Sequence, residues 1–253
     1  KVAPRRLTSG RASEGDPVFS DDSTRIAFTA KREEDDDAQV YVLNLGGGEA
    51  QRVTNWPGGA KSPRFSPDGG SILFVGPTHA GAITEEDNRK ADAARKARKY
   101  KARAYDTFPI RHWDRWLDEL RPSLMVQSLD GASPARDLLA GSELRQQRGY
   151  GGRLGNEGET IEAAWAPDGR GVVFAATTNR HEAARAEVSV SLWHVMLAGG
   201  EPRRLTGAEG DYSSPEFTRD GKVLLAKVQP ASPQWVYTAA RLVRWSWPSL
   251  DGR

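Results

Sequence analysis

Residues 62–76, SPRFSPDGGSILFVG, decide the fold that we predict for this chain. They read as a short strand ending at Phe65, a tight turn at Pro67-Asp68-Gly69, and an apolar return strand over residues 72–75. Proline presets the φ angle at the start of such a turn, and glycine adopts the positive φ that other residues disfavour. The stretch therefore predicts a β-hairpin.

The same hairpin recurs three more times, and a second pair of strands follows each copy. The other hairpins occupy residues 17–28, 164–174 and 214–225. The second strand pairs occupy residues 39–54, 123–139, 191–206 and, in the fourth copy, residues 242–253, where the last strand is missing. An aromatic residue precedes each turn by two or three positions, namely Phe19, Phe65, Trp165 or Phe217.

Four strands per repeat of roughly 50 residues are typical of a β-propeller and not of a sandwich. We therefore predict an all-β fold, a β-propeller of four-stranded blades that extends over residues 1–253. The blades are expected at residues 17–54, 63–139, 164–206 and 215–253, with a helical insertion at residues 77–122 in the second blade.

Residues 4–8, PRRLT, repeat residues 202–206 and are predicted to be a stray last strand of a preceding blade. Propellers close with about 4 to 8 blades. About four blades plus a stray strand therefore indicate part of a larger propeller. The alternative is a complete four-bladed ring, in which residues 4–8 supply the last strand of the fourth blade.

Composition limits the classes of partner. Hydrophobic residues make up 38% of the chain and charged residues 28%, as in an ordinary soluble globular protein. A formal net charge of +2 gives no argument for nucleic acid, and no apolar run approaches the roughly 18 residues of a membrane span. We expect neither nucleic acid nor membrane as a partner. The absence of cysteine fits both cytoplasm and periplasm.

The insertion begins with a helix signal. Thr84 and Asp87 have the spacing of a capping box, and acidic residues precede basic ones up to Arg103. We predict a helix of about 18 residues, polar nearly all round. It is either a solvated helix or a mobile flap beside the mouth of the propeller.

Residues 105–119 are dense in aromatic and charged side chains. Such residues dominate recognition surfaces, but Trp113, Trp116 and Leu117 are equally expected to anchor the insertion on the blade. The candidates for contact with a substrate are Arg111, Asp114 and Glu119.

No pattern predicts catalysis or metal binding. The chain has no Gly-x-Ser-x-Gly, no His-Glu-x-x-His and no glycine-rich phosphate loop before a helix, and its four histidines are widely spaced. His194 is expected to pack within or at the edge of a strand. The acidic run at residues 33–37 favours a solvated loop over a calcium site, because it lacks the spacing and glycine of an EF-hand. We predict no catalytic residue, metal or cofactor.

Two features resemble known proteins. The Ser-Pro-Asp-Gly hairpin with a following Arg-Arg-Leu-Thr strand resembles the propeller repeats of TolB and of the prolyl oligopeptidase family of serine peptidases. Residues 108–116, FPIRHWDRW, resemble the Arg-His-Trp-Asp segment in the propellers of bacterial dipeptidyl-peptidase V and acylaminoacyl-peptidase-like members.

The peptidase resemblance implies a parent enzyme whose C-terminal α/β-hydrolase domain carries a Ser, Asp and His triad. The propeller would then gate access for short peptides and help to hold a substrate terminus, and this chain alone would be inactive. Asp114, Glu119, Glu85 and Glu86 are the acidic candidates for the substrate's amino group. The alternative is a TolB-like propeller without enzymatic activity that binds a protein partner.

Overall fold

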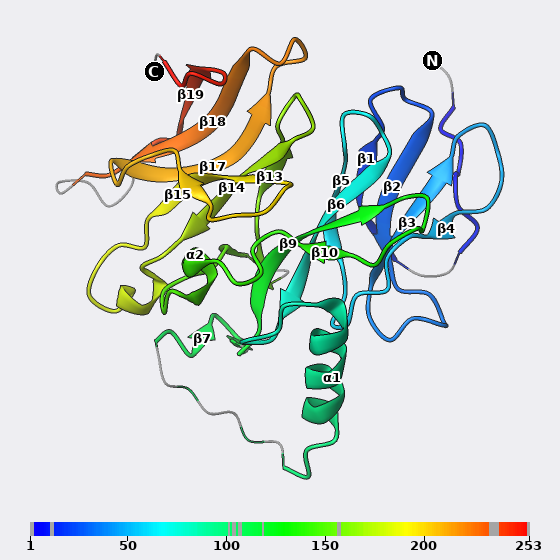
Figure 1. The fold of residues 1–253 in the computed structure, drawn as a ribbon, viewed down its shortest axis with the longest axis horizontal. Helices are drawn as coiled ribbons and strands as arrows, with labels where there is room; N and C mark the ends of the chain where they lie inside the picture. Colours follow the sequence, from blue (N-terminus) through cyan, green and yellow to red (C-terminus); the bar gives the residue numbers. More distant parts are fainter. Residues whose placement is uncertain are drawn as a thin grey trace.

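The computed structural model describes residues 3–10, 13–100, 102, 105, 108–117, 119–155, 158–232 and 238–251. In this part of the chain, four antiparallel sheets follow one another in an open arc (Figure 1). The structure confirms the all-β class, the propeller blades and the helical insertion in the second blade.

Each sheet forms from strands that follow one another in the sequence, interrupted in the second sheet by the insertion, and we number the sheets as blades in chain order. Blade 1 contains β1 (Glu14–Phe19), β2 (Arg25–Ala30), β3 (Gln39–Asn44) and β4 (Gln51–Arg52). Blade 2 contains β5 (Lys61–Phe65), β6 (Ser71–Thr78), β9 (Arg121–Ser128) and β10 (Arg136–Asp137). Blade 3 contains β13 (Ala163–Trp165), β14 (Gly171–Thr177), β15 (Val190–Met196) and β16 (Arg203–Arg204). Blade 4 contains β17 (Gly210–Phe217), β18 (Val223–Pro230) and β19 (Arg241–Ser246).

Smaller elements lie between strands of one blade or between two blades. The insertion holds α1 (Glu85–Lys96) and a hairpin of β7 (Arg111–His112) and β8 (Arg115–Trp116). Between blades 2 and 3 lie α2 (Glu143–Gln146) and a hairpin of β11 (Arg153–Gly155) and β12 (Gly158–Thr160), and a 3-10 turn at Arg180–Glu182 follows β14. Among the residues described, no helix has the length and apolar character needed to cross a membrane.

The repeated turns form as predicted. In blade 2, Asp68 accepts hydrogen bonds from the Ser66 hydroxyl at 2.5 Å and from the Gly70 amide at 2.9 Å. Gly69 has a φ of 68°, where a residue with a Cβ would be strained. The turn therefore closes through its own side chains and sets the register of the two strands.

Apolar layers between neighbouring sheets hold the arc together. Phe65, Ile72 and Phe74 lie in the layer between blades 1 and 2, where Ile72 and Phe74 are fully buried. Phe174 lies in the layer between blades 2 and 3, and Leu192 in the layer between blades 3 and 4. The two middle sheets, blades 2 and 3, are thus apolar on both faces, because each contacts a neighbour on each side.

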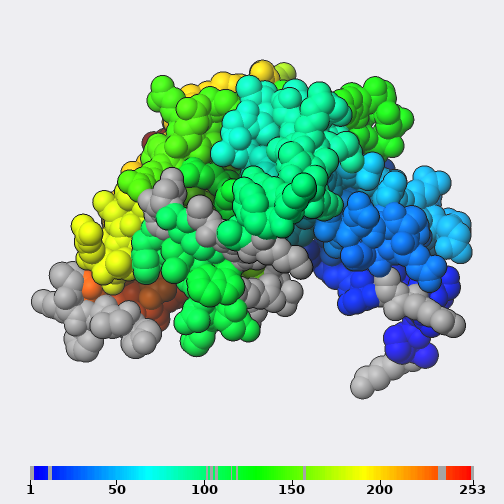
Figure 2. Space-filling view, turned by 90° about the horizontal axis from the view of Figure 1, so that it is seen from below, coloured from blue at the N-terminus to red at the C-terminus, as the bar shows by residue number. Residues whose placement is uncertain are grey.

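Residues 4–8 do not form the predicted strand. Their polar groups instead bond locally: Arg6 donates to the Thr8 carbonyl at 2.6 Å, and Thr8 donates to Glu14 at 2.5 Å. The alternative of a closed four-bladed ring is also wrong for this structure. Three strands of blade 4 lie within the described residues, and blades 1 and 4 lie at opposite ends of the arc (Figures 1 and 2).

The insertion helix begins as predicted but ends early. Thr84 and Asp87 form the capping box, with the Thr84 hydroxyl accepting from the Asp87 amide at 3.1 Å and Asp87 accepting from the Thr84 amide at 3.0 Å. The helix ends at Lys96 and does not continue to residue 103, which itself lies outside the described residues. The sequence after Glu86 is increasingly basic, and like charges one turn apart oppose further helix formation.

Candidate functional site

The insertion lies across the underside of the arc in Figure 1, where the innermost strands of the blades begin. Figure 2 looks toward this side and shows the insertion, in teal to green, between blade 1 in blue and the loops of blade 3 in yellow. Any cleft below it is therefore shared between the blades and the insertion.

Helix α1 is fixed to the blades by polar contacts. Asn88 is fully buried and accepts a hydrogen bond from the His79 amide at 2.9 Å. Arg89 donates to the Asn55 carbonyl of blade 1 at 2.9 Å. The outer face of α1 is solvated as expected, and its inner face is hydrogen-bonded to the propeller.

A buried ion pair fixes the start of the insertion. Arg145 of α2 contacts Asp137 of β10, and it also donates to the Ala82 carbonyl at 2.6 Å. Asp137 additionally accepts from the Ser123 hydroxyl at 2.5 Å and from the Leu139 amide at 2.9 Å. Because both charges are buried, each needs the other, and Arg145 thereby connects blade 2 to the insertion.

A cleft of about 430 Å³ lies between the β7–β8 hairpin and the starts of the inner strands. Its apolar lining consists of Ala38, Ala60, Val75, Pro77, Trp116, Leu117, Leu120 and Pro122. Its charged lining consists of Asp37, Lys61, Arg121 and Glu159, and three glycines, Gly58, Gly59 and Gly158, complete it. Apolar walls with a few charged groups are typical of sites that bind small organic ligands.

The charged groups of the cleft are held in place by neighbours. Glu159 pairs with Arg180 at 2.6 Å and accepts from the Gly152 amide at 2.7 Å. Arg121 donates to the backbone carbonyls of Arg145 at 2.8 Å and Gln147 at 2.6 Å. These contacts fix the positions of Glu159 and Arg121 in the wall of the cleft.

Hydrogen bonds join the inner edge of blade 1 to that of blade 2, and the inner edge of blade 3 to that of blade 4. Asp16 of β1 accepts from the Ser62 amide of β5 at 3.0 Å, and Glu162 accepts from the Ser214 amide of β17 at 2.9 Å. Asp16, Ser62 and Ser214 have positive φ angles, and the register of each of their strands shifts at this point. The bulge turns each amide toward the carboxylate of the preceding blade.

The structure does not gather the predicted site residues in the cleft. Arg111 is exposed on β7, and its guanidinium lies 6.0 Å from the centre of the Trp116 ring. Asp114 is exposed in the hairpin turn, and Glu119 pairs with Arg98 at 3.5 Å. Their roles as substrate contacts stay predictions. The other acidic candidates lie on α1, where Glu85 pairs with Arg89 and Glu86 with Lys90.

The tryptophans do not serve as the expected anchors. Trp113 is 82% exposed at the hairpin turn. Trp116 is 56% exposed, contacts the Tyr105 ring at 6.4 Å between centroids, and lines the cleft. Sequence reasoning missed Lys61 and Glu159. Lys61 begins the inner strand β5, and Glu159 lies in β12 shortly before the inner strand β13, so no motif in the sequence marks either residue.

One residue of the acidic run at residues 33–37, Asp35, stabilises blade 1. Asp35 is buried and accepts from the Tyr41 hydroxyl at 2.6 Å and from Arg52 at 2.7 Å. Burial pushes the pKa of Asp35 upward, but the hydrogen bonds from Tyr41, Arg52 and the Arg32 amide together lower it. In the described part of the chain, no group of three His, Asp or Glu residues could hold a metal ion.

His194 is half-buried and packs edge-on against Trp247, with 5.3 Å between the ring centres. Burial and the charge of Arg203 lower its pKa. Its position on β15 agrees with the packed residue expected from the sequence.

Comparison with known proteins shows which solved structures share this fold. No protein-family model matches the sequence. The structure is similar to TolB from Acinetobacter baumannii, with 17% identity and a TM-score of 0.54 over 94% of this chain and 42% of that one. It is similar to the acylaminoacyl peptidase of Pyrococcus horikoshii, with 15% identity and a TM-score of 0.55 over 92% of this chain and 30% of that one.

Two further likenesses involve peptidases. A puromycin-hydrolyzing peptidase of Mycobacterium tuberculosis has 14% identity and a TM-score of 0.54 over 95% of this chain and 29% of that one. The uncharacterized peptidase YuxL of Bacillus subtilis is 43% identical over 68 residues, which are 27% of this chain and 10% of YuxL. The chain therefore spans only part of each protein. The resemblance to TolB and acylaminoacyl-peptidase propellers is confirmed at the level of fold.

Proposed function

We propose that this chain is the propeller of a serine peptidase, which admits short peptides and helps to hold one end of the substrate. The catalytic residues would come from an α/β-hydrolase domain outside residues 1–253. The observation that carries this proposal is the 43% identity to a Bacillus subtilis peptidase, because the fold alone is shared with TolB.

The cleft suits a short peptide. Trp116 and Leu117 offer an apolar wall, and Trp116 keeps half of its surface exposed for a ligand. Glu159 and Asp37 carry the charge that a peptide's ammonium group requires, whereas Lys61 and Arg121 carry the charge that a carboxylate requires. A volume of about 430 Å³ accommodates a few residues but no folded chain.

Binding of labelled peptides to the purified chain tests this proposal. Peptides of two to six residues, with free or blocked termini, are titrated and followed by fluorescence anisotropy. Trp116→Ala removes the apolar wall and should weaken binding about tenfold, in line with aromatic anchors of interfaces. Trp113→Ala is the matched control, because Trp113 is 82% exposed and does not line the cleft. Equal affinity in both variants, or no peptide binding at all, would contradict the proposal.

The TolB-like alternative has its own support in the two TolB structures with TM-scores of 0.54 and 0.55. It predicts that the chain binds no short peptide. The gene sequence beyond Arg253 separates the two. A Gly-x-Ser-x-Gly motif within a few hundred residues would support the peptidase proposal, and a stop codon shortly after Arg253 would contradict that proposal.

A further inference from the structure

Arg121, at the start of β9, lines the cleft with a charge that pairs with no carboxylate among the described residues. Its Nη1 atom donates to two main-chain carbonyls at the end of α2, those of Arg145 at 2.8 Å and Gln147 at 2.6 Å. Both of these partners are neutral. The guanidinium of Arg180, in contrast, pairs with Glu159 at 2.6 Å. Arg121 therefore brings a positive charge to the cleft that the surrounding protein does not neutralise.

The two contacts of Arg121 use only one nitrogen of its guanidinium. An arginine side chain has five N–H donors, and Nη1 carries two of them, so Nε and Nη2 carry the other three. Within the described residues, Nε and Nη2 donate to no protein group, and neither atom is buried. An edge of two such nitrogens can bind a carboxylate through two parallel hydrogen bonds.

The main chain holds Arg121 in a fixed position. Arg121 lies opposite Thr78 in the pairing of β6 with β9, and its carbonyl accepts from the Thr78 hydroxyl at 2.9 Å. The next residue, Pro122, is buried, and its carbonyl accepts from the Tyr150 hydroxyl at 2.9 Å. Because the backbone and Nη1 are both held, a ligand of Arg121 has little ordering of the side chain left to cause.

The two carboxylates that line the cleft lie beside cations of the protein itself. Glu159 is paired with Arg180, as described above. Asp37 lies near α1, where a hydrogen bond to Asp92 is the main cause that raises the pKa of Lys96 and the charge of Asp37 adds to it. The ammonium group of a ligand would therefore have to compete with a protein cation at either carboxylate.

The apolar wall of the cleft belongs to the same segment of the chain as Arg121. Trp116, Leu117 and Leu120 line the cleft a few positions before it. The other basic residue of the lining, Lys61, has a partner of its own. A ligand that combines an apolar group with a neighbouring carboxylate would thus match both the wall and Arg121.

We propose that the cleft selects peptides by a carboxylate, which Arg121 binds through Nε and Nη2 while an apolar side chain of the same peptide contacts Trp116. This inference rests on the proposed function and adds to it which charge of the peptide is recognised. Arg121 is then a specificity-determining residue. A C-terminal apolar residue supplies both groups together, and an acidic side chain beside an apolar one supplies the same chemistry.

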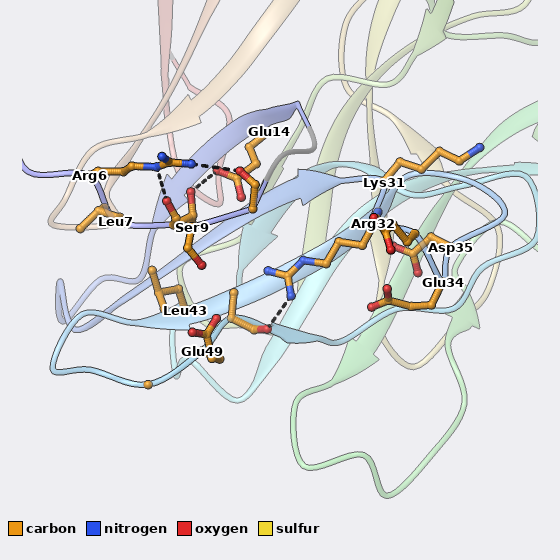
Figure 3. A pocket seen from close by; sticks show the side chains of 15 residues that line it. Arg6, Leu7, Ser9, Glu14, Lys31, Arg32, Glu34, Asp35, Leu43 and Glu49 are labelled. Carbon is orange, nitrogen blue, oxygen red and sulfur yellow. Dashed lines mark hydrogen bonds between the residues drawn. The ribbon is translucent and has the colours of Figure 1, made fainter.

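The larger groove beside blade 1 provides a matched control. Figure 3 shows this groove, of about 980 Å³, with Arg32 near Glu34 and Asp35. Arg32 donates to the Ala50 carbonyl at 3.3 Å, so it bonds to a neutral carbonyl as Arg121 does, and it does not line the cleft. Arg32→Gln therefore removes the same charge from the protein outside the cleft.

Binding of matched peptides to the purified chain tests the proposal. Ala-Ala-Phe carries a fluorescent label on its N-terminus and either a free carboxylate or an amide at its C-terminus, and anisotropy gives each dissociation constant. We expect the free acid to bind about tenfold more tightly than the amide, and this ratio to fall when NaCl rises from about 0.05 to about 0.5 M. A second pair, amidated and with Asp or Asn in the middle position, shows whether a side-chain carboxylate gives the preference.

Variants then assign the preference to one residue. Arg121→Gln should bring the ratio for the preferred pair to about one, because glutamine can still donate to a carbonyl but has no charge. Arg121→Lys should keep part of the preference, and Arg32→Gln should leave it unchanged. If Arg121 only supports α2, Arg121→Gln would weaken both peptides of a pair equally and leave the ratio as it was. That result overturns the proposal, as does an equal loss of preference in Arg32→Gln.

Two results of the same titrations separate this inference from the proposed function. Peptides that bind the unsubstituted chain through Trp116, but equally well with a carboxylate or an amide in both pairs, overturn the role of Arg121 and leave the proposed function standing. Failure of every peptide to bind contradicts the proposed function together with this inference.

Discussion

In the blades, apolar side chains of adjacent sheets meet in buried layers, whereas the insertion contacts the same sheets largely through polar groups. Ile72 and Phe74 are typical of the first region, and Asn88 and Arg89 of the second. Apolar layers extend across whole sheets, so a substitution in one of them should destabilise the arc as a whole. A polar contact involves two or three groups, so its loss should release one element. Three experiments can break or sharpen this distinction.

The same substitution in both regions should give the largest difference. Ile72→Ala opens a cavity in the layer between blades 1 and 2, where Ile72 is fully buried, and should lower the free energy of unfolding by about 2–5 kcal/mol. Ile83→Ala in the insertion, where Ile83 is 58% exposed, should change it by no more than about 0.5 kcal/mol. Urea unfolding followed by circular dichroism measures both. Equal losses would mean that the insertion shares the core of the blades.

Asn88→Ala should give an intermediate and local effect. It leaves the His79 amide without its acceptor at a buried position, which costs about 1–3 kcal/mol. Hydrogen exchange in α1 should accelerate, while exchange in β14 and β15 stays unchanged. Lys90→Ala, with a side chain that is 73% exposed, is the control on the same helix. Faster exchange throughout the blades would show that α1 is part of their cooperative unit.

The smallest effect on stability should come from a substitution in the turn of blade 1, Ser20→Ala. Hydrogen bonds from the Ser20 hydroxyl, and from the amide and hydroxyl of Thr24, lower the pKa of Asp22 from 3.8 to about 2. A lowered pKa in the folded state stabilises the fold above pH 3.8, and this contribution is lost as the pH falls toward 2. Ser20→Ala should raise the pKa of Asp22 toward 3.8, as measured by NMR titration. Blade 3 has Ala166 at this position, so the turn tolerates the change; an unchanged pKa would contradict this account.

The blades could be predicted because each repeat carries its own turn. The Ser66, Asp68 and Gly69 turn needs only residues close in sequence, and so does the capping box of Thr84 and Asp87. Where α1 ends depends on what it packs against, which no local pattern specifies. The contact of Asn88 with His79 likewise requires the helix to be placed first.

The cleft was the hardest part to predict. Lys61 and Glu159 lie far apart in the sequence and are brought together by the curvature of the arc. Arg111, Asp114 and Glu119 were predicted as substrate contacts because they lie in a segment rich in aromatic and charged residues. In the structure, a two-residue hairpin turn directs Asp114 to solvent, and Glu119 pairs with Arg98. Residues 4–8 were expected as a strand from their sequence alone, whereas a strand also requires an edge to pair with.

The carboxylates of Asp16 and Glu162 accept hydrogen bonds from main-chain amides of Ser62 and Ser214, not from their side chains. These hydrogen bonds between neighbouring blades therefore do not require a particular side chain at position 62 or 214. Because Ser62 and Ser214 adopt positive φ angles, glycine or a small polar residue at these positions would keep these bonds, whereas a β-branched residue would strain the backbone.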